Sequence, residues 1–235
     1  RGIFDFRWEN GSLESKLKNQ NIKKIKVSFL ESNMVGSRGA SYDAVGAFVD
    51  VGHNHMLQLL VLSIMTNPKQ FDAQHVHAAR VYALNELYID YDQKITRGQY
   101  EGYKSEPGVD PDSKTETFFR LHLKSKNPLF ENVDLEFEGG KGLIDMHSDI
   151  TPTMVSVEIY FKNGEKKEFK IQPVVGTVYE SYTKVYKDAI VGEQTFFVSI
   201  QEIIAEWKIA DELLEKWKNV PLIIYKKGSR AEDIK

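Results

Sequence analysis

The sequence predicts an α+β domain in which helices pack on one face of a largely antiparallel β-sheet. Apolar and polar residues alternate around Val27, over Phe119–Leu123 and over Val155–Ile171, as they do in strands that are buried on one face. Such strands suit an antiparallel sheet that helices cover on a single face. No repeat, low-complexity tract or long linker divides the chain, so we expect residues 1–235 to form a single domain.

The first half of the chain predicts three helices and one strand. A helix is expected over Ser12–Lys18 and a strand around Val27. A nearly continuous apolar run predicts a buried helix over Val51–Thr66, which ends before Pro68 because proline cannot continue a helix. A further helix is expected over Asp72–Tyr88, with the aspartate as its N-cap.

The second half of the chain predicts a hairpin and one long helix. Asn163-Gly164 lies between two alternating runs, which is a strong hairpin signal. Ser199 and Glu202 have the spacing of a capping box and mark the start of the long helix. The buried stripe of this helix is predicted, from residues at helical spacing, to contain Ile203, Trp207, Ala210, Leu214 and Trp217. The tail after Pro221 is expected to be irregular.

Composition excludes several classes of protein. A net charge of -3 gives no bulk field that would attract nucleic acid or an anionic membrane, and the longest apolar run is too short to span a bilayer. The absence of cysteine excludes disulfide and thiol chemistry and agrees with a cytoplasmic protein. His53 and His55, like His75 and His77, lie two residues apart on predicted helices, where their side chains diverge by about 200°, so we expect no metal site.

The most informative stretch of the sequence opens the predicted apolar helix. Asp50 and His55 place a carboxylate and an imidazole at the mouth of a buried segment, which suits a dry site that needs a proton acceptor. Spacing alone also allows a structural interpretation, in which Asp50 is the N-cap of the helix and the histidines lie at its solvated end.

Short motifs in one fixed order cover nearly the whole chain. An ungapped run extends from Glu31 to Gln58 through a Gly-rich loop, and further matches continue toward both ends. They include Phe6-Arg7, Gly36, Arg38, Gly39, Tyr42-Asp43, Asn54, Gly98-Gln99-Tyr100, Gln172-Pro173, Tyr179-Glu180, Gly192-Glu193-Gln194 and Trp207. Together these motifs resemble the C-terminal domain of the glucose-6-phosphate dehydrogenase family.

The resemblance implies a function and a set of site residues. It implies oxidation of D-glucose 6-phosphate to 6-phosphoglucono-1,5-lactone with NADP, the first step of the pentose phosphate pathway. It implies that His55 is the general base and that Glu31, Asp50, Lys141 and Gln172 bind the substrate. NADP would be bound mainly by an N-terminal Rossmann domain that is absent from this sequence, and a homodimer is a possible assembly. We therefore expect the chain to be inactive alone.

Departures from the family's motifs favour an alternative. Met146 stands where the family has a substrate arginine, and Glu138 stands where it often has an arginine. The segment after Pro173 is also short, in a region that contributes to the family's dimer interface. The alternative is a non-catalytic domain that binds a sugar phosphate or a protein partner. The sequence does not distinguish NADP from NAD, because the domain that would decide this is absent.

Overall fold

The computed structural model describes residue 3, residues 7–8, residue 17 and residues 21–143, 153–171 and 178–235. Its central feature is an eight-stranded sheet with the order β7-β6-β1-β5-β4-β3-β8, in which β2 also pairs with β4. Among the described strands, only the pairs β1–β5 and β3–β8 are parallel. The predicted α+β class with a largely antiparallel sheet is therefore confirmed.

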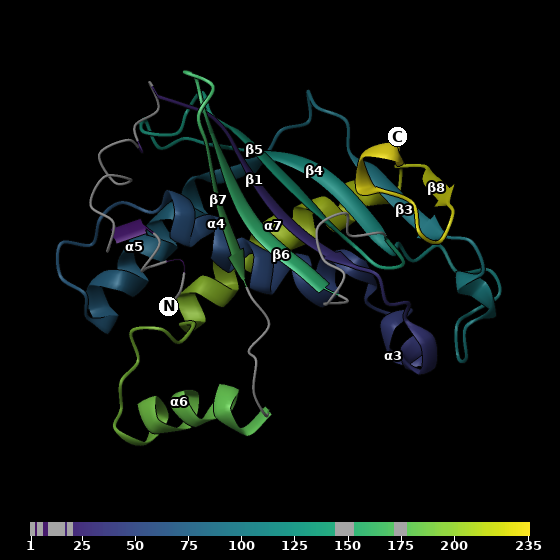
Figure 1. The fold of residues 1–235 in the computed structure, drawn as a ribbon, viewed down its shortest axis with the longest axis horizontal. Helices are drawn as coiled ribbons and strands as arrows, with labels where there is room; N and C mark the ends of the chain where they lie inside the picture. Colours follow the sequence, from purple (N-terminus) through teal and green to yellow (C-terminus); the bar gives the residue numbers. More distant parts are fainter. Residues whose placement is uncertain (1–2, 4–6, 9–16, 18–20, 144–152, 172–177) are drawn as a thin grey trace.

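Several helices follow β1, strands β4 to β7 then succeed one another with no helix between them in the described part of the chain, and α6 and α7 precede β8 (Figure 1). The strands are β1 (Ile22–Glu31), β2 (Leu87–Ile89), β3 (Thr96–Tyr100), β4 (Phe118–Ser125), β5 (Asp134–Gly140), β6 (Thr153–Phe161), β7 (Lys166–Ile171) and β8 (Leu222–Tyr225). The α-helices are α3 (Gly39–Tyr42), α4 (Leu57–Ile64), α5 (Ala73–Glu86), α6 (Val178–Ile190) and α7 (Ile200–Trp217). The 3-10 helices are η2 (Gly36–Arg38), η4 (Tyr103–Ser105) and η5 (Ala231–Asp233), and η3 (Phe48–Met56) is a π-helix.

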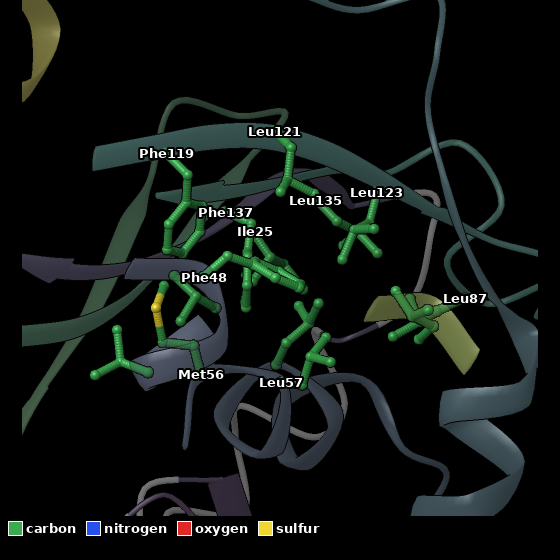
Figure 2. Close-up of a cluster of buried hydrophobic side chains, with 14 of the residues drawn as sticks. Ile25, Phe48, Met56, Leu57, Leu87, Phe119, Leu121, Leu123, Leu135 and Phe137 are labelled. Carbon is green, nitrogen blue, oxygen red and sulfur yellow. The ribbon is translucent and has the colours of Figure 1, made fainter. Parts of the chain in front are cut away.

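One face of the sheet packs on the helices and forms the core. Figure 2 shows Ile25, Leu121 and Phe137 of three neighbouring strands directed toward Met56 and Leu57. All five side chains are at most 1% exposed. Burial of one such side chain stabilises a fold by about 1.5–3 kcal/mol, so this layer holds the helices on the sheet.

The other face of the sheet carries paired charges. Lys26 of β1 forms ion pairs of 3.0 Å with Glu136 and 2.6 Å with Glu138, and Arg120 of β4 lies 2.8 Å from Glu138. Although burial acts to raise the pKa of Glu136, Lys24 and Lys26 lower it to about 2. Alternation of apolar and charged residues thus gives this sheet its two chemically different faces.

Most of the strand predictions are confirmed, and the differences have local causes. The Asn163-Gly164 turn forms, with Gly164 at a φ of +89°. The helix capped by Asp72 ends at Glu86 rather than at Tyr88, because the next three residues pair with β4. The tail after Pro221 is not irregular, since it adds the parallel strand β8 to the sheet. The helix predicted over Ser12–Lys18 lies almost wholly outside the described residues.

The buried stripe of α7 differs from the prediction. Ile203 and Trp207 are each 39% exposed, whereas Glu202 and Glu206 are 0% and 3% exposed. Arg80 of α5 explains this rotation, because its guanidinium lies 3.2 Å from Glu202 and compensates the buried charge. The side chains that α7 buries are Glu202, Ala205, Glu206, Ile209, Ala210, Leu213 and Trp217.

Helix α6 stands apart from the layered body in Figure 1. Tyr182, Val185, Tyr186 and Ile190 fall on one side of it, at spacings of three and four residues. Their exposed fractions are 53%, 45%, 64% and 83%. An apolar stripe this exposed is uncommon on a monomeric domain.

The capping box at the start of α7 yields a test of the fold. The Ser199 hydroxyl accepts a hydrogen bond of 3.3 Å from the backbone N–H of Glu202. We expect Ser199→Ala to lower the free energy of unfolding by about 1 kcal/mol, because a helix N–H loses its acceptor. Urea denaturation measures this change. Ser105→Ala, at an exposed serine outside any cap, is the control, and equal losses in both variants would contradict the assignment.

Candidate functional site

Lys141 is at the centre of the candidate site. Its ammonium forms an ion pair with Glu31 and lies 3.4 Å from Oδ2 of Asp50. The side chain of Lys141 is 4% exposed, while those of Glu31 and Asp50 are 17% and 25% exposed. Three of the predicted substrate-binding residues therefore meet in one cluster, with the cation inside and the carboxylates closer to the surface.

Parallel pairing of β1 with β5 explains why two of these residues meet. Leu30 is paired with Gly140, so the residues that follow, Glu31 and Lys141, leave neighbouring strands at their carboxyl ends. Each lies an even number of residues from a core-facing side chain of its own strand, as Lys141 does from Phe137. Both side chains therefore lie on the helix side of the sheet. The carboxyl ends of parallel strands are a frequent place for ligand sites.

Asp50 reaches this point from the π-helix η3, which lies very close to the sheet. A Cβ atom at Gly139 would lie 2.8 Å from Phe119, and one at Gly52 would lie 2.9 Å from the same ring. Glycine at both positions is therefore required for the helix to approach the strands. Aromatic side chains of β4 fill the space beside Gly139 and Gly140, so these two glycines serve close packing rather than the approach of a ligand.

Asp50 is not the N-cap of its helix. The π-helix begins at Phe48, and its capping residue Ala47 makes no side-chain hydrogen bond. A buried carboxylate from another part of the chain takes over this role, since Glu116 Oε1 accepts a hydrogen bond of 3.2 Å from the Phe48 N–H. Gly46, at a φ of +76°, leaves room for that carboxylate. Asp50 is consequently available to Lys141 and to a ligand.

His55 lies on the same π-helix as Asp50, five residues further along the chain. Hydrogen bonds in a π-helix join residues five apart, which places the two side chains on neighbouring turns of one face. In an α-helix, residues five apart would point about 140° away from each other. His55 is exposed, and its ring has no hydrogen-bond partner among the described residues. It is thus free to contact a ligand or another polypeptide.

His53 has a different environment, which the sequence did not predict. The structural interpretation puts both histidines at a solvated helix end, but the ring of His53 packs 4.4 Å from that of Trp207, and Nδ1 lies 3.0 Å from the Val49 carbonyl oxygen. Burial lowers its pKa below the ordinary value. His53 therefore joins η3 to α7, and His55 alone of this pair faces outward.

The remaining predicted positions are not part of the described cluster. Gln172 and Met146 lie outside the described residues. Glu138 projects to the opposite face of the sheet, where Arg120 and Lys26 pair with it, so its charge is not directed at Lys141. Within the described ranges, no group of three or more histidine, aspartate or glutamate side chains could hold a metal ion.

The sequence analysis did not identify the buried contact that joins the helix after His55 to α7. Gln58, three residues after His55, donates a hydrogen bond of 2.7 Å to Glu206 of α7. Burial raises the pKa of Glu206 to about 7, against the opposing effect of that hydrogen bond. Glutamates four residues apart on a helix usually indicate a solvated face, so the pattern gave no signal for this buried contact.

Comparison with known proteins identifies the family of this chain. The family described as "Glucose-6-phosphate dehydrogenase, C-terminal domain" matches residues 4–178 and 168–233. The chain belongs to this family. Glu31, Asp50, His55 and Lys141 all lie within the matched residues 4–178.

Several curated relatives share this domain. The glucose-6-phosphate 1-dehydrogenase of Chlamydia trachomatis is 27% identical over 94% of this chain and 62% of the relative. The glucose-6-phosphate 1-dehydrogenase gcd1 of Schizosaccharomyces pombe is 28% identical over 97% of the chain and 57% of the relative. The chain therefore spans little more than half of the length of the relatives it matches.

Solved structures of the same family have the same fold. A glucose-6-phosphate dehydrogenase in complex with its substrate glucose-6-phosphate superposes with a TM-score of 0.78 and 26% identity, over 98% of this chain and 57% of that one. The enzyme from Mycobacterium avium gives a TM-score of 0.81 at 24% identity, over 97% and 57% of the two chains, and supports the fold alone. Within the described residues, no helix has the length and apolar character that crossing a bilayer requires.

The carboxylate that caps η3 predicts a pH dependence of stability. Burial raises the pKa of Glu116 to about 7, although the Phe48 N–H and Arg97 act to lower it. A carboxyl group with a raised pKa in the folded state binds its proton more tightly than in the unfolded chain. Its contribution to stability is complete below about pH 4.5 and is lost as the pH rises through 7. We expect the free energy of unfolding to fall across this interval.

Glu116→Gln removes this titration and should make the decrease between pH 4.5 and 8 shallower, by an amount on the order of 1 kcal/mol. Some slope will remain, because the pKa of Glu206 is raised as well. Chemical denaturation at a series of pH values measures both profiles. The control is Glu101→Gln at an exposed position. An unchanged slope in Glu116→Gln would show that this carboxyl does not titrate there.

Proposed function

We propose that this chain is the substrate-binding part of an NADP-dependent glucose-6-phosphate 1-dehydrogenase. The observation that carries the proposal is the cluster of Lys141, Glu31 and Asp50 beside the outward-facing His55. Membership of the family and the likeness to an enzyme solved in complex with glucose-6-phosphate support it. On this proposal residues 1–235 form one domain of a longer cytoplasmic enzyme, and one plant relative is itself named cytoplasmic.

The cluster has the chemistry that a phosphorylated sugar requires. A sugar ring presents several hydroxyl donors, and ionised carboxylates such as Glu31 and Asp50 only accept hydrogen bonds. Charge-assisted bonds of this kind are about twice as strong as neutral ones. Lys141 supplies donors for a ring or phosphate oxygen and lies between the two acids. We assign substrate binding to these three residues and to Gln172.

His55 is proposed to accept the proton of the sugar's C1 hydroxyl. Its position one π-turn beyond Asp50 supports this role, because the two side chains then share one face of η3. A neutral imidazole suits this task because its ordinary pKa is about 6.5. Its exposure is consistent with a substrate, or a second polypeptide, that covers it only in the working enzyme.

NADP supplies the hydride acceptor when it is bound, but this chain does not fit its phosphates. Dinucleotide sites use a Gly-rich loop between a strand and a helix, and the sequence contains no G-x-G-x-x-G motif. We therefore assign the cofactor to an N-terminal Rossmann domain, which would account for the remaining length of the relatives. The proposal includes a homodimer as its possible assembly.

The exposed stripe of α7 is proposed as the surface that receives this domain. Ile200, Ile203, Ile204 and Trp207 are 61%, 39%, 64% and 39% exposed. Trp207 packs on His53, so the stripe is continuous with the helix that carries His55. A domain that docks on this stripe would cover His55 and bring a nicotinamide to the sugar. This explains why α7 buries glutamates while it exposes isoleucines and a tryptophan.

Substrate binding is tested on the chain by calorimetric titration with glucose 6-phosphate. We expect Lys141→Met to weaken binding at least tenfold, because the ammonium is lost and the two carboxylates then repel each other. The exposed Lys162→Met is the charge-matched control and should bind like wild type. Affinity that is equal in all three proteins would remove Lys141 from the site.

Proton acceptance is tested by joining the chain to the N-terminal part of an active relative. We expect the chain alone to produce no NADPH, and the joined protein to oxidise glucose 6-phosphate. His55→Asn should reduce kcat about 100-fold or more, because general-base catalysis typically contributes this much, with glucose 6-phosphate affinity changed less than threefold. Binding without turnover in the joined wild-type protein would favour the alternative of a non-catalytic sugar-phosphate domain.

A further inference from the structure

Tyr42 lies directly against the candidate site, although no role has yet been given to it. It ends the short helix α3 and is 3% exposed. Nζ of Lys141 lies over its ring at 5.5 Å from the centroid, and the Arg38 guanidinium carbon lies 6.0 Å from it. Cations within about 6 Å of an aromatic face are attracted by the negative charge of that face. The ring of Tyr42 is thus the third group, after two carboxylates, that surrounds the Lys141 ammonium.

The hydroxyl of Tyr42 does not explain why an aromatic residue is placed here. It is buried and has no hydrogen-bond partner among the described residues. Its aromatic neighbours differ, since the hydroxyl of Tyr103 donates to Asp43 at 2.9 Å and that of Tyr225 donates to the Lys141 carbonyl at 2.7 Å. An unpartnered buried hydroxyl is destabilising, so the favourable contact of Tyr42 is made by its ring.

The ring also remains neutral at every working pH. Burial, followed by the charges of Glu116 and Asp50, raises the pKa of Tyr42 well above its ordinary value. The hydroxyl therefore keeps its proton, and the ring presents an uncharged aromatic face. A charged phenolate would compete with the carboxylates for Lys141, whereas a neutral face attracts the ammonium without taking one of its three N–H donors.

Lys141 needs such a contact because its side chain is long and flexible. Glu31 is in direct ion-pair contact with the ammonium, whereas Asp50 lies 3.4 Å away. With only these two neighbours, the ammonium would settle on the nearer carboxylate and leave Asp50 to the Arg38 guanidinium, whose Nη1 lies 3.8 Å from Oδ1 of Asp50. We propose that Tyr42 is a positioning residue, whose ring face holds the Lys141 ammonium between Glu31 and Asp50 so that both carboxylates stay oriented toward the sugar. The sugar in this statement rests on the proposed function, but the ring contact does not.

The affinity test varies the charge on the ring face and keeps the shape. Tyr42→Phe should bind glucose 6-phosphate within twofold of wild type. Phenylalanines with one, two and three ring fluorines at position 42 should then weaken binding stepwise, by about tenfold in total, because fluorine withdraws charge from the face. The same series at Phe130, which is 1% exposed with no cation over its ring among the described contacts, is the matched control and should show no trend.

A spectroscopic test does not depend on ligand binding. In protein labelled with ¹³C at lysine Cε, the Lys141 signal, assigned by its absence in Lys141→Arg, should be shifted upfield by the ring in wild type and in Tyr42→Phe. Tyr42→Leu should abolish the shift, while Tyr103→Leu, at a 0% exposed position, should keep it at comparable thermal destabilisation.

The outcomes separate the two proposals. An ordinary Lys141 shift in wild type, or no fluorine trend in a protein that binds glucose 6-phosphate, would overturn the positioning role. Loss of affinity in Tyr42→Phe would also overturn it, because the hydroxyl would then be the group that matters. An upfield shift in a protein that does not bind glucose 6-phosphate would leave Tyr42 as the residue that positions Lys141 and would refute the proposed substrate.

Discussion

A buried ammonium between two carboxylates is the interaction on which the site depends. Removing a charge from water costs several kcal/mol unless it is paired, so Lys141 can be 4% exposed only because Glu31 and Asp50 lie beside it. The pairing in turn requires two parallel strands that end together and a helix that approaches the sheet closely. The parallel β1–β5 pair and Gly139 meet these requirements.

The need to compensate a buried charge also applies to two buried acids outside the cluster. Glu116 is enclosed at the start of η3 and Glu202 at the start of α7, and each stabilises a helix that faces the site. Arg80 compensates Glu202, while Arg97 lies 3.7 Å from Glu116 and burial raises the pKa of Glu116 to about 7. Glu116 fixes the start of η3, which carries Asp50 and His55, and Glu202 joins α7 to Arg80 of α5 and Gln58 of α4. The polar interior therefore carries the geometry of the site, and the apolar layer mainly carries stability.

Sequence patterns predicted the sheet well and the helices around the site less well. The alternation within β4 and β6 and the capping box at Ser199 depend on residues that are close in sequence, so the sequence predicts them. The side-chain face of η3 was not predictable, because a π-helix has no distinctive residue pattern. The predicted buried stripe of α7 was partly wrong, because this helix has a second apolar stripe that is equally regular. Only Arg80, over 100 residues away in sequence, decides which of the two stripes is buried. Glu31 and Lys141 were proposed only through the resemblance to a family, whereas Asp50 and His55 also stood out at the mouth of the apolar run.

The π-helix has a consequence for how this site can change. Its turns hold more residues than α-helical turns, and such segments occur mostly as short interruptions in functional regions. If the same residues wound as an ordinary α-helix, the five-residue spacing would turn His55 about 140° away from Asp50. A change of helix type could thereby separate the imidazole from the carboxylates while the core remained intact. Substitutions that favour α-helical winding in this segment are therefore a simple route by which a descendant of this domain could lose the arrangement of its site and keep its fold.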